Sequence, residues 1–216
     1  MEPRGHFRVT VSKDDHVFAS AHFITFAGHR CEGLHGHNYR AGVTVEGAID
    51  EESWWVFDFV TLKKIMRRLC DEIDHKVLLP LQNPRLQVAE HDESVTVAYE
   101  GTPRYVFPRR DCALLPITNT TVEMLAELLT GRVRGELEKL GARGVTAIEM
   151  EIEENFGQSA FYRLALRYAP ICSGRGCDIS CHEDTKPRRE PLGTFFVWSR
   201  VFVTSWLHFC WAHFVG

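Results

Sequence analysis

The strongest constraint on the fold is a segment in which apolar side chains recur at every second position. In NYRAGVTVEGAI, residues 38–49, the alternating residues Tyr39, Ala41, Val43 and Val45 share one face. Successive side chains of a strand point to opposite faces, so this period predicts a strand with one buried side. Residues 7–25 read as a further strand region. Together the two segments predict a long antiparallel hairpin whose connection carries RCEGLHGHNYR, residues 30–40.

Two segments with helical spacing follow. The first begins after Asp58, and the second is predicted from Thr120, which has capping-box spacing to Glu123, to a stop at Gly141. The apolar stripes of the two helices are Leu62, Ile65, Met66, Leu69 and Ile73, and Leu125, Leu128, Leu129, Val133 and Leu137.

Strand patterns surround the second helix. Residues 94–107 predict a hairpin with its turn at residues 100–103. Residues 145–154, with Ile148, Met150 and Ile152 on one face, and residues 160–168 predict two closing strands. The order β-β-α-(hairpin)-α-β-β indicates an α+β domain in which two helices pack on one face of an antiparallel sheet.

The composition changes after Tyr168. We expect one domain over residues 1–168, with an inserted hairpin region at about 76–117, and a poorly ordered tail over 169–216. Residues 195–216 are apolar and aromatic over a length that could span a bilayer. Arg200 within this run makes insertion costly, so a membrane span is not expected.

The overall composition excludes several classes of protein. A net charge of −4 implies no broad nucleic-acid footprint. MEPRGHFRV at the N-terminus has no apolar core of a secretory signal. Seven cysteines, an odd number, disfavour a complete disulfide framework and suggest reduced thiols in the cytoplasm.

The histidines near the predicted hairpin have the spacing of metal ligands. His35 and His37 lie two apart, so an extended segment presents both on one face. Gly36 between them leaves room for a neighbouring strand or a ligand. His22, in the preceding strand, can lie opposite the pair, and three imidazoles with an open position are typical of catalytic zinc. His6, His16 and His29 are rival third ligands.

Two further features carry reactive groups. Cys31 stands four residues before His35 in a glycine-containing segment, and a nearby cation would lower the pKa of its thiol. The alternative is an inert buried cysteine. Asp74 precedes His75 at the end of the first helix, where a carboxylate can support a general acid–base histidine. The alternative for His75 is a favourable charge at a helix C-terminus.

Taken together, these segments resemble the 6-pyruvoyl-tetrahydropterin synthase / 6-carboxytetrahydropterin synthase family. The resemblance runs from about residue 7 to residue 168. It rests on FASAHF with His22, CEGLHGHNY with Cys31, His35 and His37, WVFDF with Asp58, DEIDH with Asp74 and His75, NTTVEMLAE with Thr121 and Glu123, and EENFGQSAFY with Glu154. It implies a tunnelling fold (T-fold) and a symmetric homo-oligomer, commonly a hexamer.

The resemblance also implies roles for the residues in these blocks. His22, His35 and His37 would bind Zn²⁺. Cys31 would be the proton-abstracting thiolate, supported by Asp74 and His75, and Thr121 and Glu154 would contact the substrate. The implied substrate is a small-molecule pterin triphosphate, 7,8-dihydroneopterin triphosphate. Zinc would polarise its side-chain hydroxyl groups.

The substrate-anchoring acid requires a choice between two neighbours. The family pattern places an alanine six residues and a tyrosine eight residues after the acid, and Glu154 fits through Ala160 and Tyr162 whereas Glu153 does not. A carboxylate suits this role because a pterin offers two parallel N–H donors on its 2-amino/N3 edge. Without the family pattern, a solvated acid at a strand end is the simpler interpretation of Glu154.

The spacing of Cys31 favours one branch of the family. Three residues separate Cys31 from His35, as in the carboxy synthases, whereas the pyruvoyl synthases of animals usually have five. The expected product is 6-carboxy-5,6,7,8-tetrahydropterin, on the route to queuosine and other deazapurines. Glu32 stands where a folate-linked branch carries its acid, so a dihydroneopterin-cleaving activity with Glu32 as base is an alternative. A pyruvoyl synthase and a non-enzymatic pterin-binding scaffold are further alternatives.

Overall fold

The protein is described by a computed structural model over residues 5–28 and 30–166. The predicted tail over 169–216 and the rival ligand His29 lie outside these residues. Neither α-helix in the described part of the chain is long and apolar enough to cross a membrane.

A seven-stranded sheet forms the body of the fold. Its strand order is β10-β6-β2-β5-β11-β12, and β1 pairs with β5 beside this path. The strands are β1 (Phe7–Val11), β2 (Val17–His22), β5 (His35–Gly47), β6 (Lys76–Pro80), β10 (Cys112–Leu115), β11 (Val145–Asn155) and β12 (Gln158–Ala165). The 3-10 turns η1 (Lys13–Asp15) and η2 (Arg109–Asp111) precede β2 and β10.

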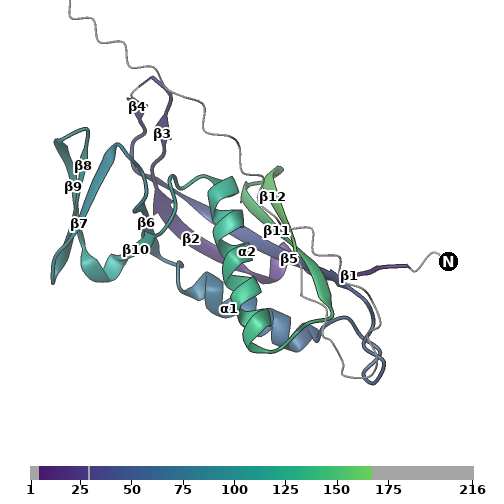
Figure 1. Ribbon diagram of the computed structural model, residues 1–216. Coiled ribbons are helices and arrows are strands. Elements are labelled where there is room, and N and C mark those ends of the chain that lie inside the picture. Colours follow the sequence, from purple (N-terminus) through teal and green to yellow (C-terminus); the bar gives the residue numbers. More distant parts are fainter. Residues whose placement is uncertain (1–4, 29, 167–216) are drawn as a thin grey trace, which may run out of the picture. The chain divides into compact units, whose positions relative to one another are not determined.

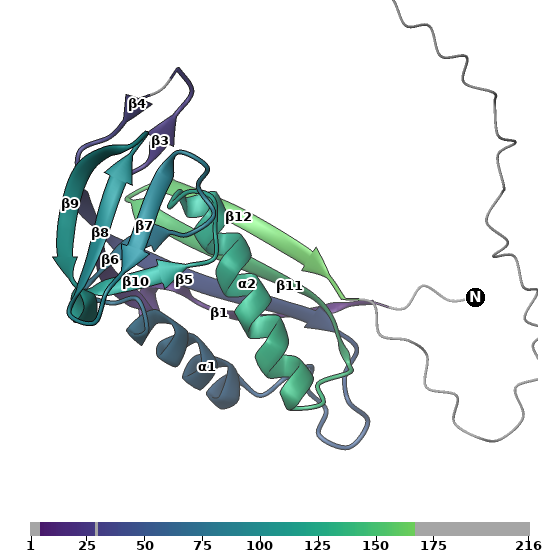
Figure 2. The same cartoon turned by 60° about the vertical axis from the view of Figure 1, so that its left-hand side comes forward.

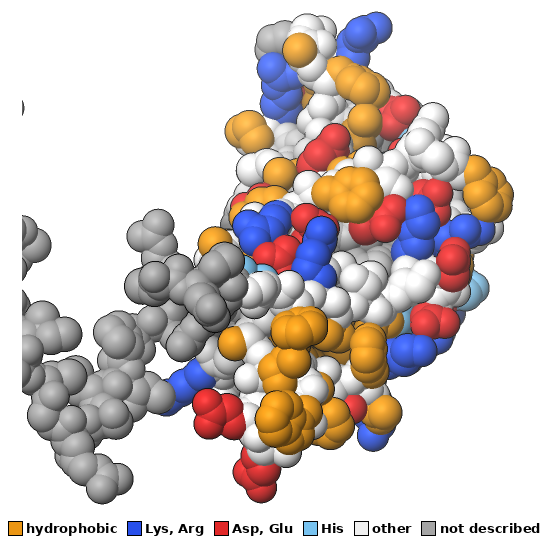
Figure 3. Space-filling view, turned by 90° about the vertical axis from the view of Figure 1, so that its right-hand side faces the viewer, with side chains coloured by type: hydrophobic (Ala, Val, Ile, Leu, Met, Phe, Trp, Pro, Cys, Tyr) orange, Lys and Arg blue, Asp and Glu red, His pale blue; other side chains and the backbone are white. Residues whose placement is uncertain are grey.

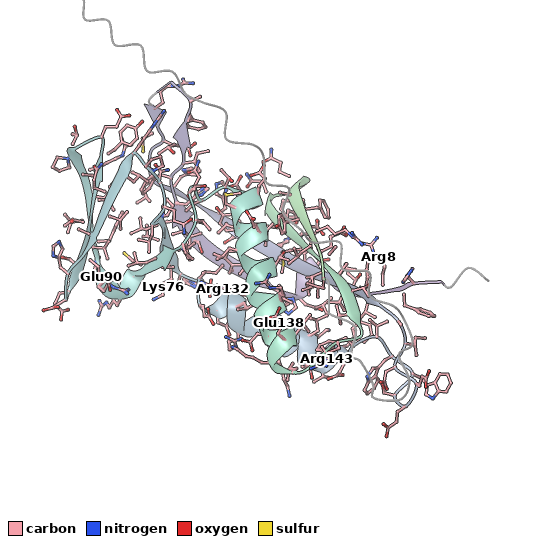
Figure 4. The ribbon with its side chains drawn as sticks, in the orientation of Figure 1. Arg8, Lys76, Glu90, Arg132, Glu138 and Arg143 are labelled. Atoms are coloured by element: carbon pink, nitrogen blue, oxygen red, sulfur yellow. The ribbon has the colours of Figure 1, made fainter. Side chains whose placement is uncertain are left out.

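Both α-helices cover the same face of this sheet, as the sequence predicts (Figure 1). They are α1 (Phe59–Asp71) and α2 (Val122–Lys139). Their apolar stripes pack against β5 and β11, where Tyr39, Val45 and Ile148 are fully buried. Arg132 on α2 pairs with Glu72 after α1 at 2.9 Å (Figure 4). The predicted amphipathic pattern therefore accounts for the main core.

The helix boundaries confirm the predicted start of the first helix after Asp58 and correct the predicted cap of the second. The Asp58 side chain accepts hydrogen bonds from the backbone N–H groups of Val60 and Thr61, so it caps α1. The predicted capping box of Thr120 and Glu123 is wrong. Thr121, not Thr120, is the N-cap of α2, and it makes no side-chain capping bond. The hydroxyl of Thr120 is buried and donates instead to the carbonyl of Phe23 at 3.0 Å. Gly141, with φ +68°, ends α2 as predicted.

The inserted region contains more strands than its pattern indicates. The predicted hairpin is confirmed as β8 (Ser94–Tyr99) and β9 (Thr102–Pro108), and β7 (Leu86–Glu90) joins them in a separate three-stranded sheet (Figure 2). β6 and β10 flank this sheet in the sequence and pair in parallel, β6 with β2 and β10 with β6. The main sheet is therefore mixed at this edge. Short apolar runs such as KVLLP do not alternate, so their pattern cannot reveal a buried parallel strand.

A second hydrophobic cluster lies under the three-stranded sheet. Its buried members are Phe23, Leu79, Leu86, Val95, Val97 and Cys112. Cys31 and Tyr105 pack against this cluster. The short hairpin of β3 (Thr25–Phe26) and β4 (Arg30–Cys31) lies next to the three-stranded sheet in Figure 2.

The sheet face opposite the helices carries ion pairs. Glu149 alternates with the buried Ile148 and Met150, and it pairs with Arg8 at 2.5 Å. Glu46 pairs with Arg163 at 2.6 Å on the same face. Figure 3 shows acidic and basic side chains lying next to one another on this side of the molecule. A half-buried face with paired charges agrees with the alternating pattern of β5 and β11.

Two glycines should respond to alanine in opposite directions. A Cβ on Gly47 would lie 2.3 Å from the carbonyl oxygen of Gly144, whereas a Cβ on the exposed, helical Gly131 meets no atom within 4 Å. We expect Gly47→Ala to lower the free energy of unfolding by about 1–3 kcal/mol through overpacking. Gly131→Ala should raise it by about 0.5–1 kcal/mol. Urea unfolding at pH 7 measures both changes. Shifts of the same sign would contradict the close packing of Gly47 against Gly144 and the open space at Gly131.

Candidate metal and substrate site

Three histidines converge where β2 pairs with the start of β5. The antiparallel register places His22 opposite His35 and Ser20 opposite His37. One ring nitrogen from each of His22, His35 and His37 lies within 4.8 Å of the others, so the three could hold a metal ion. The described rivals His6 and His16 do not belong to this group. A Cβ on Gly36 would lie 3.1 Å from the carbonyl oxygen of Ser20, so a glycine suits the close approach of the strands.

Backbone carbonyls orient two of the three rings. His22 Nδ1 donates to the carbonyl of Thr120 at 2.8 Å, and His35 Nδ1 donates to the carbonyl of Gly33 at 3.0 Å. These bonds leave both Nε2 atoms directed at each other, 3.2 Å apart. Burial lowers the pKa of His22, which favours the neutral imidazole that binds metals. A hydrogen bond on the far nitrogen is the usual support of a metal-binding histidine.

The third ring supplies an observation of a different kind. His37 Nε2 is buried and forms no hydrogen bond within the described part of the chain. Buried polar nitrogens are rarely left without a partner. One ring nitrogen of His37 lies within 4.8 Å of a nitrogen of each of the other two imidazoles, so the donor set fits a metal ion held by three nitrogens.

Glu154 lies on the histidine side of β11. Its Oε1 is 3.4 Å from His22 Nε2 and 3.5 Å from His37 Nε2, and it accepts a hydrogen bond from the hydroxyl of Tyr39 at 3.4 Å. Burial and the neighbouring Glu154 raise the pKa of Tyr39, so the phenol stays a donor. Tyr39 follows His35 and His37 at two-residue intervals, and that period could have identified it as a member of the site.

Glu153 has different surroundings. Its carboxylate is buried, accepts a hydrogen bond from the N–H of Gly157 at 3.0 Å, and lies 3.5 Å from Lys13 and 3.7 Å from Arg40. The hydrogen bond from Gly157 and the two cations lower the pKa of Glu153. Glu153 therefore has the contacts of a structural acid, and only Glu154 faces the histidines.

Two hollows meet at His37. One, of about 500 Å³, is lined by His37, Asn38, His75 and Lys76 among others. The ammonium group of Lys76 (labelled in Figure 4) donates a hydrogen bond to the carbonyl of Arg110. The other, of about 440 Å³, is lined by His37, Arg40, Glu154 and Phe156 among others. Of the three histidines, His37 lines both hollows, whereas His22 and His35 line neither of them.

Cys31 and the Asp74–His75 pair make no polar contact with each other in the described part of the chain. His75 has φ +55° and an exposed ring whose Nδ1 lies 2.8 Å from Asp74 Oδ2. Burial raises the pKa of Asp74, but hydrogen bonds from the N–H of Ala19 and from His75 outweigh it, and the net pKa is lowered. No hydrogen bond or ion pair joins Cys31 to this pair between residues 5 and 166.

The other predicted residues lie near the histidines or the thiol. Thr121 is partly buried at the start of α2, next to the Thr120 carbonyl that orients His22. Glu32 Oε2 is 3.8 Å from His35 Nδ1. The carbonyls of Thr120 and Gly33 could not be predicted, because any residue type supplies one.

Comparison with known proteins decides the family. A family model described as 6-pyruvoyl tetrahydropterin synthase matches residues 10–165. The chain belongs to this family. A putative 6-carboxy-5,6,7,8-tetrahydropterin synthase of Methanocaldococcus jannaschii is 37% identical over 68% of this chain and 88% of that relative. A 6-carboxy-5,6,7,8-tetrahydropterin synthase of Aquifex aeolicus is 28% identical over 62% of this chain and 76% of that relative.

Solved structures agree with this assignment. The crystal structure of 6-pyruvoyl tetrahydropterin synthase from Plasmodium vivax superposes with a TM-score of 0.69 at 30% identity, over 76% of this chain and all of that chain. A variant of that enzyme in which a catalytic glutamate is replaced by alanine gives the same TM-score of 0.69. The family resemblance and the T-fold predicted from the sequence are confirmed, and family membership indicates a pterin synthase enzyme.

Proposed function

We propose that this pterin synthase converts 7,8-dihydroneopterin triphosphate to 6-carboxy-5,6,7,8-tetrahydropterin in a zinc-dependent lyase reaction. The observation that carries the proposal is the convergence of three imidazoles beside the carboxylate of Glu154. Relatives named 6-carboxy-5,6,7,8-tetrahydropterin synthase support the choice of product. We place the reaction in the cytoplasm, on the route to queuosine and other deazapurines.

Zinc is the metal that suits the donor set best. Three neutral imidazoles with an open position are typical of catalytic zinc, and His37 Nε2, which is buried and makes no hydrogen bond in the described part of the chain, supports this assignment. Bound zinc would polarise the hydroxyl groups of the substrate side chain.

The protein residues have separate tasks in this proposal. Glu154 accepts the 2-amino and N3 hydrogens of the pterin, and the hydroxyl of Tyr39 orients its carboxylate. Thr121 contacts the substrate. Cys31, as the thiolate, removes a carbon-bound proton, and His75 moves protons at the side chain with Asp74 stabilising its charged form. Triphosphate leaves, and addition of one water with cleavage of a carbon–carbon bond then releases the two outer side-chain carbons as acetaldehyde and leaves the carboxylate on the tetrahydropterin.

We propose that the protein acts as a homo-oligomer, a hexamer as the family resemblance implies. Cys31 makes no hydrogen bond or ion pair with Asp74 or His75 in the described part of the chain, and this supports the proposal, because another copy can supply one part of the site. The exposed ring of His75 is accessible to such a neighbour.

Glu32 supports a second candidate function. A solved relative at a TM-score of 0.69 has a catalytic glutamate, and Glu32 lies 3.8 Å from His35. With Glu32 as base, the chain would cleave the side chain of dihydroneopterin for folate synthesis. Conversion to 6-pyruvoyl-tetrahydropterin is the further alternative, since the solved relative from Plasmodium vivax carries that name.

The metal assignment is tested by the metal content of histidine variants. We expect His35→Ala and His37→Ala each to lose most of the roughly one equivalent of zinc per chain, because each removes one of three ligands. His91→Ala, at an exposed position between β7 and β8, is the matched control and should keep its zinc. Elemental analysis after dialysis measures the effect, and full zinc in both ligand variants would refute the site.

The reaction and its base are tested together by product analysis. The zinc-loaded protein should convert 7,8-dihydroneopterin triphosphate to 6-carboxy-5,6,7,8-tetrahydropterin, identified by mass spectrometry. Cys31→Ala should reduce turnover at least about 100-fold, the scale of lost acid–base catalysis, and should still bind pterin. Glu32→Gln should keep most of the activity. Active Cys31→Ala with inactive Glu32→Gln would instead establish Glu32 as the base.

The anchoring acid is tested by two neighbouring substitutions. Glu154→Gln should weaken pterin binding by about 1.5–3 kcal/mol, the scale of a charge-assisted hydrogen bond, because an amide donor would face an N–H. Glu153→Gln should leave the Kd unchanged and lower the urea midpoint, because Lys13 and Arg40 lose a charged partner. Isothermal titration with the pterin measures both, and the opposite ranking would overturn the choice of Glu154.

A further inference from the structure

The three-stranded sheet of the inserted region holds the backbone that carries Cys31. We define the thiol loop as residues Cys31–Leu34. Arg104 on β9 donates from Nη2 to the carbonyl of Glu32 at 2.7 Å and to the carbonyl of Cys31 at 3.3 Å. The next residue, Tyr105, accepts a hydrogen bond from the N–H of Leu34 at 3.2 Å. Two adjacent residues of β9 therefore hold three residues of the thiol loop.

β9 is itself fixed by packing. The ring of Tyr105 stacks on Phe107, with centroids 5.4 Å apart, and contacts the buried Phe23 at the same centroid distance. Its partner strand β8 buries Val95 and Val97 in the second hydrophobic cluster. The donors that hold the thiol loop thus come from a packed sheet, and such a support defines the position of a reactive group better than a free loop does.

The thiol loop also determines the orientation of one imidazole. Gly33, whose carbonyl accepts from His35 Nδ1, lies between the residues that Arg104 and Tyr105 contact. The loop is also supported by the N–H of Glu32, which donates to the carbonyl of Ile24 at 2.9 Å, by the pairing of Cys31 with Thr25, and by the packing of Cys31 against the second hydrophobic cluster. Leu34 is 39% exposed, so apolar burial does little to fix this end.

We propose that the β7–β8–β9 sheet is a positioning element in which Arg104 and Tyr105 hold the thiol loop in the geometry of the reaction. The inference rests on the function proposed above, with Cys31 as base. It assigns a task to the inserted region, whose role the sequence leaves open. Arg104 and Tyr105 act through the backbone of the loop and are positioning residues.

The charge of Arg104 is consistent with this task. Burial raises the pKa of the Cys31 thiol, the guanidinium of Arg104 opposes this rise, and Glu32 adds to it. Arg104 thus favours the thiolate while it holds the two carbonyls.

Two variants test the proposal without opening the core. Tyr105→Phe keeps the aromatic packing and removes only the acceptor for Leu34, and Arg104→Met keeps the chain length and removes the donors. Arg110→Met is the matched control, because the Arg110 side chain is 89% exposed in the same inserted region. All proteins are compared as zinc-loaded full chains, and melting temperatures equal to that of the wild type verify that the variants are folded.

We expect kcat to fall about 10- to 100-fold in Arg104→Met and less in Tyr105→Phe, the scale of a displaced catalytic group. KM should change less than about twofold, because neither residue contacts Glu154 on β11. Hydrogen–deuterium exchange of a peptide covering residues 31–35 should accelerate in both variants. Arg110→Met should match the wild type in kcat and exchange.

Unchanged exchange in both variants overturns the positioning role, whatever the activity. Wild-type kcat in both variants also overturns it. Hydrogen–deuterium exchange is measured without substrate, so it tests the positioning role independently of the proposed pterin reaction. A wild-type protein that binds zinc but does not turn over the pterin overturns the proposed function alone, and faster exchange in the variants then still supports the positioning contacts.

Discussion

The antiparallel register between β2 and β5 is the constraint on which the site depends. It pairs His22 with His35 and Ser20 with His37, so one sheet face receives all three imidazoles. A shift of one residue would turn the side chains of one strand to the opposite face and separate the ligands. The same strand β5 buries Tyr39, Ala41, Val43 and Val45 under the two helices. The main hydrophobic core therefore enforces the register that the candidate metal site needs.

The part of the structure that can be predicted is the part in which the sequence has a periodic apolar pattern or turn residues. The alternation in β5, the stripes of α1 and α2, and the turn at Glu100 and Gly101 carry periodic or conformational signals in the sequence. The spacing of His35 and His37 belongs to the same class, because two residues per repeat place them on one face. These signals suffice for the order of the main elements and for the metal-binding group.

The remainder depends on contacts between distant segments that leave no local pattern. The parallel strands β6 and β10 are short apolar runs, and nothing in four or five residues distinguishes them from other buried segments. Thr120 has the spacing of a cap, but its hydroxyl donates to the carbonyl of Phe23, the residue that follows β2. The role of Arg104 depends on carbonyls some seventy positions away in the sequence, and only the folded chain brings them together.

The carbonyls that orient His22 and His35 come from two differently built parts of the fold. Thr120 leads into α2 and the main core, whereas Gly33 lies in the segment held by the second hydrophobic cluster and its sheet. The histidine group therefore lies at the junction of two packing units. Any ion that binds the three nitrogens draws its affinity from the correct docking of both units. By linkage, the same ion stabilises each unit against local opening. A metal ion bound in this way would couple the two hydrophobic clusters, so that their unfolding becomes cooperative.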